Sequence, residues 1–433
     1  SHGHRRQHAA NKFYNALFEH VRIIWYEAPE DLNAAELFTR LNIGRIPLTD
    51  AELVKALLLS RSRQDDDRSD RSHEIAAQWD AIERDLRDPE LWAFITASAD
   101  EEPTHISLLL DTLAGHTGHE GAFYTFETLR EQIVTDAQGF WNSVLDLHSL
   151  LLGWYADRNL FHKIGFLRTQ GVSFRELIDR SQDRLKSVFE AHLDGLIRHS
   201  LRLSESGLRD LEYDNKVVAG RALLLMNVET VRTRTASSER YSFHEHAKGR
   251  WSLEHIHAQN AETLNRAEQW RAWLELHRAA YATLNPVDSQ AERLLGQVEE
   301  VLARDTIREQ DFRRLERALT EAMSQDGDVA VVDGDSIANL ALLDGGDNTA
   351  LSNSVFAVKR ADVLRLDKEG RYIPVCTRNV FLKYYSPGDE HQMQFWSRWD
   401  REHYLNAMVD ALRPYLRPEA AESESEGSEE MVD

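Results

Sequence analysis

The chain holds 433 residues, more than one domain usually contains, so two or more units with cores of their own are expected. Hydrophobic residues make up 42% of it and proline and glycine are sparse, which is typical of a folded, mainly helical protein. Its one cysteine, Cys376, excludes an intramolecular disulfide and a cysteine-based zinc cluster, and it fits the reducing cytoplasm. No apolar run reaches the roughly 20 residues that cross a bilayer, so no membrane partner is expected.

The net charge of −22 argues against a nucleic-acid partner, because phosphate binding usually depends on an excess of lysine and arginine. The charge is unevenly distributed, however. Residues 419–433 contain seven acids and no base, and without them the net charge is −15. Residues 355–385 contain seven bases and three acids. A local basic face beside a catalytic site can serve an enzyme that binds DNA transiently, with weak and salt-sensitive affinity.

Helical spacing of apolar residues predicts that the N-terminal half is built from helices. Helices are expected over 10–26 and 33–41, and Thr49 forms a capping box with Glu52 before a third. The charged stretch 61–71 has no apolar anchor, so we predict a solvated loop there. Further helices are expected over 75–95, 106–113, 126–133, 141–155, 174–178, 185–197 and 208–226.

The pattern changes near Thr233, after which short strands join the helices. The acidic tail at the end is expected to be disordered. In chain order we predict a strand over 251–257, helices over 262–277, 289–304 and 306–323, an apolar segment over 329–332, a turn over 333–335, a strand over 337–343, a turn at Gly345 and Gly346, and helices over 349–364 and 392–412.

Four side chains in this C-terminal part supply the groups that phosphodiester hydrolysis needs. A histidine suits the role of general base, since its pKa lies near working pH. A hard divalent ion, Mg²⁺ before Mn²⁺ or others, needs oxygen ligands. We therefore predict that His255 is the base, that Glu254 and Asn348 are metal ligands, and that Asn339 holds the His255 imidazole by a hydrogen bond.

Each of these assignments has a structural alternative. Glu254 and His255, taken alone, are more typical of a surface pair than of a catalytic pair. Asn339 can close a turn, and Asn348 can cap the helix that follows it. Asn353 competes with Asn348 as the second metal ligand.

Three segments carry a family resemblance. Residues 253–260 read Leu-Glu-His-Ile-His-Ala-Gln-Asn, residues 337–343 read Ile-Ala-Asn-Leu-Ala-Leu-Leu, and residues 348–359 read Asn-Thr-Ala-Leu-Ser-Asn-Ser-Val-Phe-Ala-Val-Lys. In this order they resemble the His-Me finger (HNH-type) nuclease domain of GmrSD-type, SspE-like modification-dependent restriction enzymes. Residues 38–59 are similar to the closing segment of the domain that precedes it in this family. The resemblance implies an enzyme that cuts or nicks phage or foreign DNA in bacterial defence.

The chain departs from the family pattern in two respects. It lacks the family's Asp-Gly-Gln-Gln-Arg motif for nucleotide hydrolysis, so we expect it to begin within a longer protein and nucleotide binding to belong to a preceding domain. Ala258 replaces the usual proline, and His257 before it is a candidate to assist His255 if the strand continues. Lys359 and Arg360 are predicted phosphate contacts, with solvated helix charges as the alternative.

We therefore expect a mainly α protein with a helical middle region and a small ββα-metal (His-Me finger) nuclease core near its C-terminus. The alternatives are a helical regulatory subunit whose nuclease site is degenerate, and an RNA-directed nuclease. The expected divisions are 1–72, the end of a sensor domain or a linker; 73–232, a helical domain; 233–415, the nuclease domain with a helical insertion over 261–326; and 416–433, the acidic tail.

Overall fold

A computed structural model describes most of the chain. Among the helices it describes, we find none with the length and apolar character of a membrane span. The predicted helix over 33–41, most of the predicted helix over 10–26, the apolar segment over 329–332, the predicted ligands Asn348 and Asn353, and residues 420–433 of the acidic tail lie outside the described residues. The structure describes residues 12–14, 18–19, 21, 48–64, 70–100, 102–257, 264–284, 289–322, 334–345, 354–386 and 396–419.

The fold is mainly α, as predicted, and its N-terminal part consists of helices alone among the described residues. The capping box is confirmed, because Glu52 accepts from the Thr49 N–H and Thr49 Oγ1 accepts from the Glu52 N–H. The loop predicted over 61–71 is wrong at both ends, where helices continue into it. The helices are α3 (Asp50–Gln64), α4 (Asp70–Leu86), α5 (Pro89–Thr96), α6 (Ser107–Ala114), α7 (Tyr124–Thr135), α8 (Ala137–Ala156), α9 (Arg158–Thr169), α10 (Phe174–Ser181), α11 (Lys186–Leu201), α12 (Glu205–Arg209) and α13 (Lys216–Thr233).

The C-terminal part adds two strands to the helices. In chain order its elements are α14 (Phe243–Lys248), β1 (Trp251–His255), α15 (Ala267–Leu284), α16 (Ser289–Leu302), α17 (Glu309–Ala322), the 3₁₀ turn η1 (Ile337–Asn339), β2 (Leu340–Asp344), α19 (Phe356–Lys368), α20 (Val375–Phe381), α21 (Arg398–Leu412) and the 3₁₀ turn η2 (Arg413–Tyr415). The two strands pair antiparallel, with His255 opposite Leu340 and Glu254 opposite Ala341. α13 contacts both strands, and α20 contacts β2.

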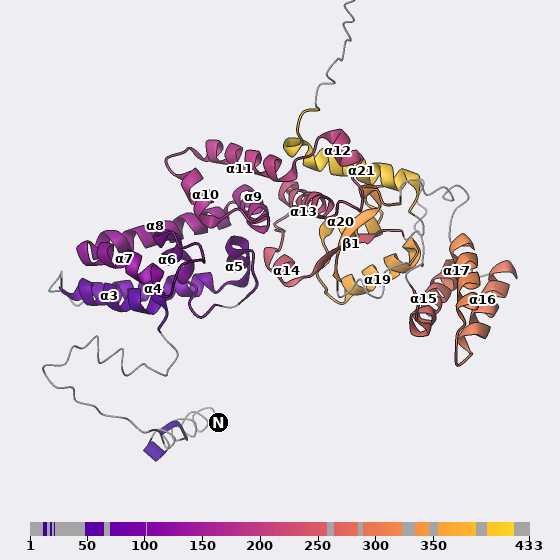
Figure 1. Ribbon diagram of the computed structural model, residues 1–433, viewed down its shortest axis with the longest axis horizontal. Helices are drawn as coiled ribbons and strands as arrows, with labels where there is room; N and C mark the ends of the chain where they lie inside the picture. The colour runs from indigo at the N-terminus through magenta and orange to yellow at the C-terminus, as the bar shows by residue number, and fades with distance from the viewer. Residues whose placement is uncertain are drawn as a thin grey trace, which may run out of the picture.

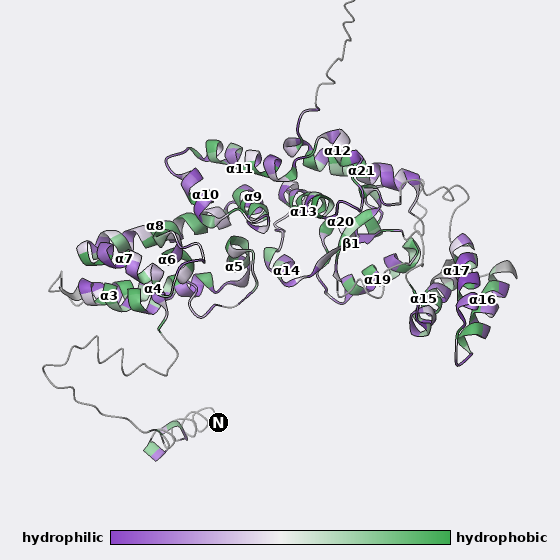
Figure 2. Cartoon of the chain, in the orientation of Figure 1, coloured by the Kyte–Doolittle hydropathy of each residue, from purple (hydrophilic) through white to green (hydrophobic). Residues whose placement is uncertain are grey.

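The buried apolar residues form two clusters. The larger runs from Ala51 to Tyr415 and joins the N-terminal helices to the sheet, α20 and α21. The smaller lies within α15, α16 and α17 and includes three residues around the start of α19. Figure 1 shows these three helices grouped beside the rest of the molecule, and Figure 2 shows apolar and polar residues on different sides of most helices.

Three buried side chains each hydrogen-bond the main chain of a segment that is distant in the sequence. Each donates to the carbonyl four residues earlier in its own helix and accepts a main-chain N–H from elsewhere. His162 bonds Arg158 O and the Tyr241 N–H, His277 bonds Trp273 O and the Val355 N–H, and Asn227 bonds Leu223 O and the Cys376 N–H. Val355 precedes α19 and Cys376 lies in the first turn of α20, so His277 and Asn227 hold the starts of these two helices.

Candidate functional site

β1 presents its side chains to two faces of the sheet. Successive side chains of a strand point to opposite faces, so Trp251, Leu253 and His255 share one face and Glu254 lies on the other. The contacts agree with this geometry. Trp251 and Leu253 line a hollow together with residues of α13, whereas Glu254 pairs with Lys359 of α19. The two adjacent residues predicted to form one site therefore face different parts of the molecule.

His255 lies at the end of β1 beside a carboxylate. Its Nε2 is 3.1 Å from Oδ1 of Asp335, and its ring centroid is 4.7 Å from that of Tyr213. The histidine side chain is 26% exposed and that of Asp335 is 62% exposed, so solvent reaches both. An accessible imidazole whose one nitrogen is held by a carboxylate is the arrangement of a general base.

Main-chain pairing brings Asp335 to this position. The Tyr213 N–H donates to Asp335 O over 2.7 Å, and the Ile337 N–H donates to Leu211 O over 2.8 Å. The segment after α12 is thereby fastened to the segment before β2. The sequence predicted Asp335 only as part of a turn and missed it as a partner of His255. The signal available was a carboxylate two residues before the second predicted strand.

Glu254 is buried against a lysine. Its carboxylate accepts from the Lys359 ammonium, which also donates to the main-chain oxygen of His255. The two side chains are 9% and 1% exposed. Burial lowers the pKa of Lys359, and the Glu254 carboxylate opposes that shift. This ion pair fastens the first turn of α19 to the end of β1.

Asn339 has a role other than the one predicted. Its Nδ2 donates to His257 O and to Gly334 O over 2.9 Å each, and its Oδ1 accepts from the His257 N–H over 3.1 Å. The amide is 1% exposed and fully occupied by these main-chain groups. The prediction that it holds the His255 imidazole is therefore wrong. It holds the chain where β1 ends and the segment that leads into β2.

His257 does not continue the face of His255, because β1 ends at His255. Its Nδ1 accepts from the Phe356 N–H at the start of α19 over 3.4 Å. Burial, reinforced by the charges of Lys359 and Arg401, lowers the pKa of His257 to about 4. A ring that stays neutral at pH 7 and bonds a helix start has the properties of a structural group.

The predicted phosphate contacts on α19 are engaged within the protein. Lys359 is buried in its pair with Glu254, so its prediction as a phosphate contact is wrong for this structure. Arg360 donates through Nε to Phe381 O over 2.9 Å, and burial lowers its pKa. Arg360 therefore links α19 to α20.

Glu254 supplies the kind of donor that a divalent ion prefers, a carboxylate oxygen. A cation at this position would replace the Lys359 ammonium as its partner. Within the described ranges no three His, Cys, Asp or Glu side chains are placed to share a metal ion. The second predicted ligand, Asn348, lies outside those ranges.

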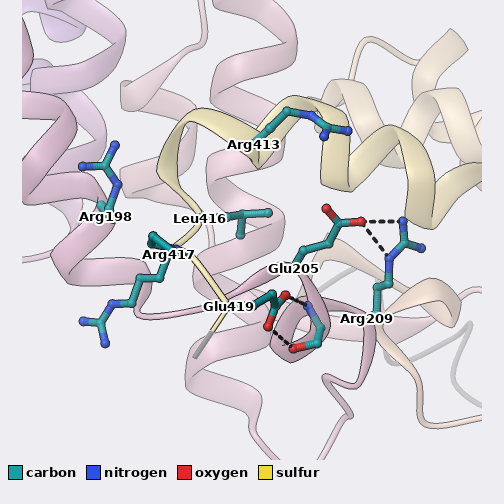
Figure 3. Close-up of a pocket in the computed structure, with 9 residues that line it drawn as sticks. Arg198, Glu205, Arg209, Arg413, Leu416, Arg417 and Glu419 are labelled. Atoms are coloured by element: carbon teal, nitrogen blue, oxygen red, sulfur yellow. Dashed lines mark hydrogen bonds and ion pairs between the residues drawn. The ribbon is translucent and has the colours of Figure 1, made fainter. Parts of the chain in front are cut away.

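An arginine-lined hollow lies between α11, α12 and the residues that follow α21. It has a volume of about 780 Å³, and Figure 3 shows its residues. We call it the arginine hollow, after Arg198, Arg209, Arg413 and Arg417. Glu205 bonds Arg209 over 3.0 Å, and Glu419 accepts from the Ser206 N–H and hydroxyl over 2.8 and 2.7 Å. Arg209 precedes Tyr213 by four residues, and four residues of chain span at most about 14 Å. The Cα atom of Arg209 in the hollow therefore lies within about that distance of the Cα atom of Tyr213, which packs on His255.

The chain matches no protein-family model, no curated protein and no solved structure with which it was compared.

Proposed function

We propose that the protein is a metal-dependent DNA endonuclease of bacterial antiphage defence, with His255 as its general base. The observation that supports this most directly is the accessible His255 imidazole, 3.1 Å from the Asp335 carboxylate at the end of β1. In the proposal, β1, β2 and α19 are the two strands and the helix of a ββα nuclease core. The family resemblance of residues 253–260, 337–343 and 348–359 is the independent argument for a nuclease.

The residues of the chain divide the work as follows. With Nε2–H donated to Asp335, the lone pair of His255 is on Nδ1, which takes the proton of the water that attacks phosphorus. Tyr213 restricts the ring from one side. A divalent ion would supply positive charge for the phosphate and the leaving oxygen. Because Glu254 lies on the opposite face of β1 and pairs with Lys359, an ion that serves the same phosphate as His255 would need oxygen donors on the His255 face. The arginine hollow would hold phosphates further along the strand.

Plasmid nicking tests this proposal. Wild-type protein is expected to nick supercoiled plasmid with Mg²⁺ or Mn²⁺ and to be inactive with EDTA. His255→Ala should abolish nicking at an unchanged midpoint of thermal unfolding. His73→Ala, which removes an exposed histidine of α4, is the matched control and should nick normally. Normal nicking by His255→Ala refutes the assignment. Digestion of RNA in parallel decides whether RNA is the preferred substrate.

A second function is favoured by the Glu254–Lys359 ion pair. The Lys359 ammonium already neutralises the Glu254 carboxylate, which therefore has no free charge for a metal ion. A degenerate nuclease site in a helical regulatory subunit would contain such a pair. Calorimetric titration with Mn²⁺ separates the two. A nuclease should bind the ion, whereas a degenerate site should take up none.

A further inference from the structure

A second hollow opens on the His255 face of the sheet. It has a volume of about 560 Å³ and lies between β1, the first turns of α13 and the end of α9. Tyr213, Trp251 and Leu253 contribute its apolar lining, and Gly220 of α13 lies in its wall. This size and mixture are those of a small-molecule pocket rather than of a packing defect.

Two aromatic rings in this pocket are held in fixed orientations. Trp251 is stacked on His246 with ring centroids 5.3 Å apart, and its indole N–H donates to His246 O. Tyr213 packs against His255 on one side and has the Lys216 ammonium 4.5 Å from its ring centroid. Fixed rings of this kind offer a stacking surface for a flat ligand at little entropic cost.

The polar groups of the pocket suit a nucleotide. Lys216 is exposed at its rim, and among the described residues its ammonium contacts a ring and no carboxylate. Gln170 and Thr169 at the end of α9 also line the pocket, but the Gln170 amide accepts from Arg221 and donates to the Thr169 hydroxyl. A base could stack on the rings while its phosphate meets the lysine.

Gly220 keeps the pocket open. It lies inside α13, where glycine costs up to about 1 kcal/mol relative to alanine. A Cβ added at this position would meet no atom within 4 Å, so packing does not require the glycine. Its absent side chain leaves space that a larger residue would fill.

We propose that this pocket holds one base of a single-stranded segment of the substrate, next to the bond that His255 attacks. This inference rests on the proposed nuclease function. Tyr213 connects the two places, because it lines the pocket and packs on the His255 ring. A base stacked on Tyr213 brings the strand next to the His255 ring, so the pocket positions the strand for cleavage.

The test measures the contribution of bases to binding without cleavage. All proteins carry His255→Ala, and the probes are labelled 20-mers of thymidylate and of abasic deoxyribose phosphate, compared by fluorescence anisotropy. The parent should bind thymidylate at least about fivefold more tightly than the abasic strand, the lower end for stacking one base. Gly220→Leu should abolish that ratio by weakening only thymidylate binding, and Gly220→Ala, the matched control, should retain it.

Tyr213→Leu provides a second variant, which removes a stacking ring without adding bulk. The proposal is refuted if the parent binds the thymidylate and the abasic strand equally well. It is also refuted if Gly220→Leu and Tyr213→Leu both leave the preference for thymidylate unchanged. The nicking assay of the wild-type protein is independent of this result. A base-dependent ratio without nicking would retain the pocket and reject the nuclease, and nicking with no base-dependent ratio would do the reverse.

Discussion

Losing one partner of the buried pair Glu254–Lys359 should destabilise the protein more than losing both. Removing one partner leaves an uncompensated charge in a site that is almost closed to water, which typically costs about 3–5 kcal/mol. Lys359→Met should therefore lower the free energy of unfolding by that amount, and Glu254→Gln combined with Lys359→Met should recover most of it. Urea denaturation measures both.

The pair Lys55–Asp80 is the matched control for this experiment, because its side chains are 32% and 72% exposed. Lys55→Met should cost less than about 1 kcal/mol. Equal losses for Lys55→Met and Lys359→Met would show that burial does not set the strength of the inner pair.

Asp335 should act by positioning His255. Asp335→Asn keeps the shape of the side chain but removes the charge that fixes the imidazole, so kcat for nicking should fall at least about tenfold with KM unchanged. Because Asp335 is 62% exposed, the unfolding midpoint should not move. Asp214→Asn, an exposed neighbour of Tyr213, is the control. A fall in stability that parallels the fall in activity would instead make Asp335 a structural residue.

Among the elements, the histidines that fix distant segments should make the fold sensitive to acid. Burial lowers the pKa of His162 to about 4 and that of His277 to about 3, both below the ordinary value of 6.5. The unfolded chain therefore binds these protons first, so stability is complete above pH 6.5 and is lost as pH falls towards 4. Each histidine contributes up to about 1.4 kcal/mol per pH unit to the slope.

His277→Gln isolates one of these contributions. The free energy of unfolding, measured by urea at pH 7, 6 and 5, should decline less steeply than in the wild type, by up to about 1.4 kcal/mol per pH unit. His73→Gln changes an exposed histidine and should leave the slope unaltered. An unaltered slope in His277→Gln would mean that its ring is already charged in the folded protein.

The sequence predicted most elements but missed α9, α14 and α20. Amphipathic helices such as α4 and α8 show the 3.6-residue period that a buried face produces. α9 has eight consecutive buried residues, and these include His162, Lys163 and Gly165, so its buried part does not stand out in the sequence as an apolar segment. Both strands were predicted, but the first was predicted two residues too long, and the second was predicted to start three residues early, where the 3₁₀ turn η1 lies.

The candidate site was predictable in its residues but not in its contacts. His255 and Glu254 were selected because of their types and spacing. Their separation onto two faces follows from strand alternation, but the partners on each face do not. Asp335 and Lys359 reach β1 through antiparallel pairing and helix docking across 80 and 105 residues, which local sequence pattern does not encode.

For the whole molecule, net charge should limit how tightly a polyanion binds. The chain carries −22, and residues 420–433 contribute six acids and no base. These acids are joined directly to Glu419, which lines the arginine hollow, so their effective concentration at its arginines is high. A chain that ends at Glu419 should bind a DNA duplex about three- to tenfold more tightly at 50 mM salt than the full chain. At 0.3 M salt the gain should vanish, because screening shortens the range of the repulsion.

Replacing the six acids by their amides at full length should give the same gain, which separates the effect of the tail's charge from the effect of its length. Arg417→Glu in the shortened chain should remove the gain if the hollow is where the phosphates bind. A gain that persists at high salt would show that the tail excludes DNA by its bulk and not by its charge.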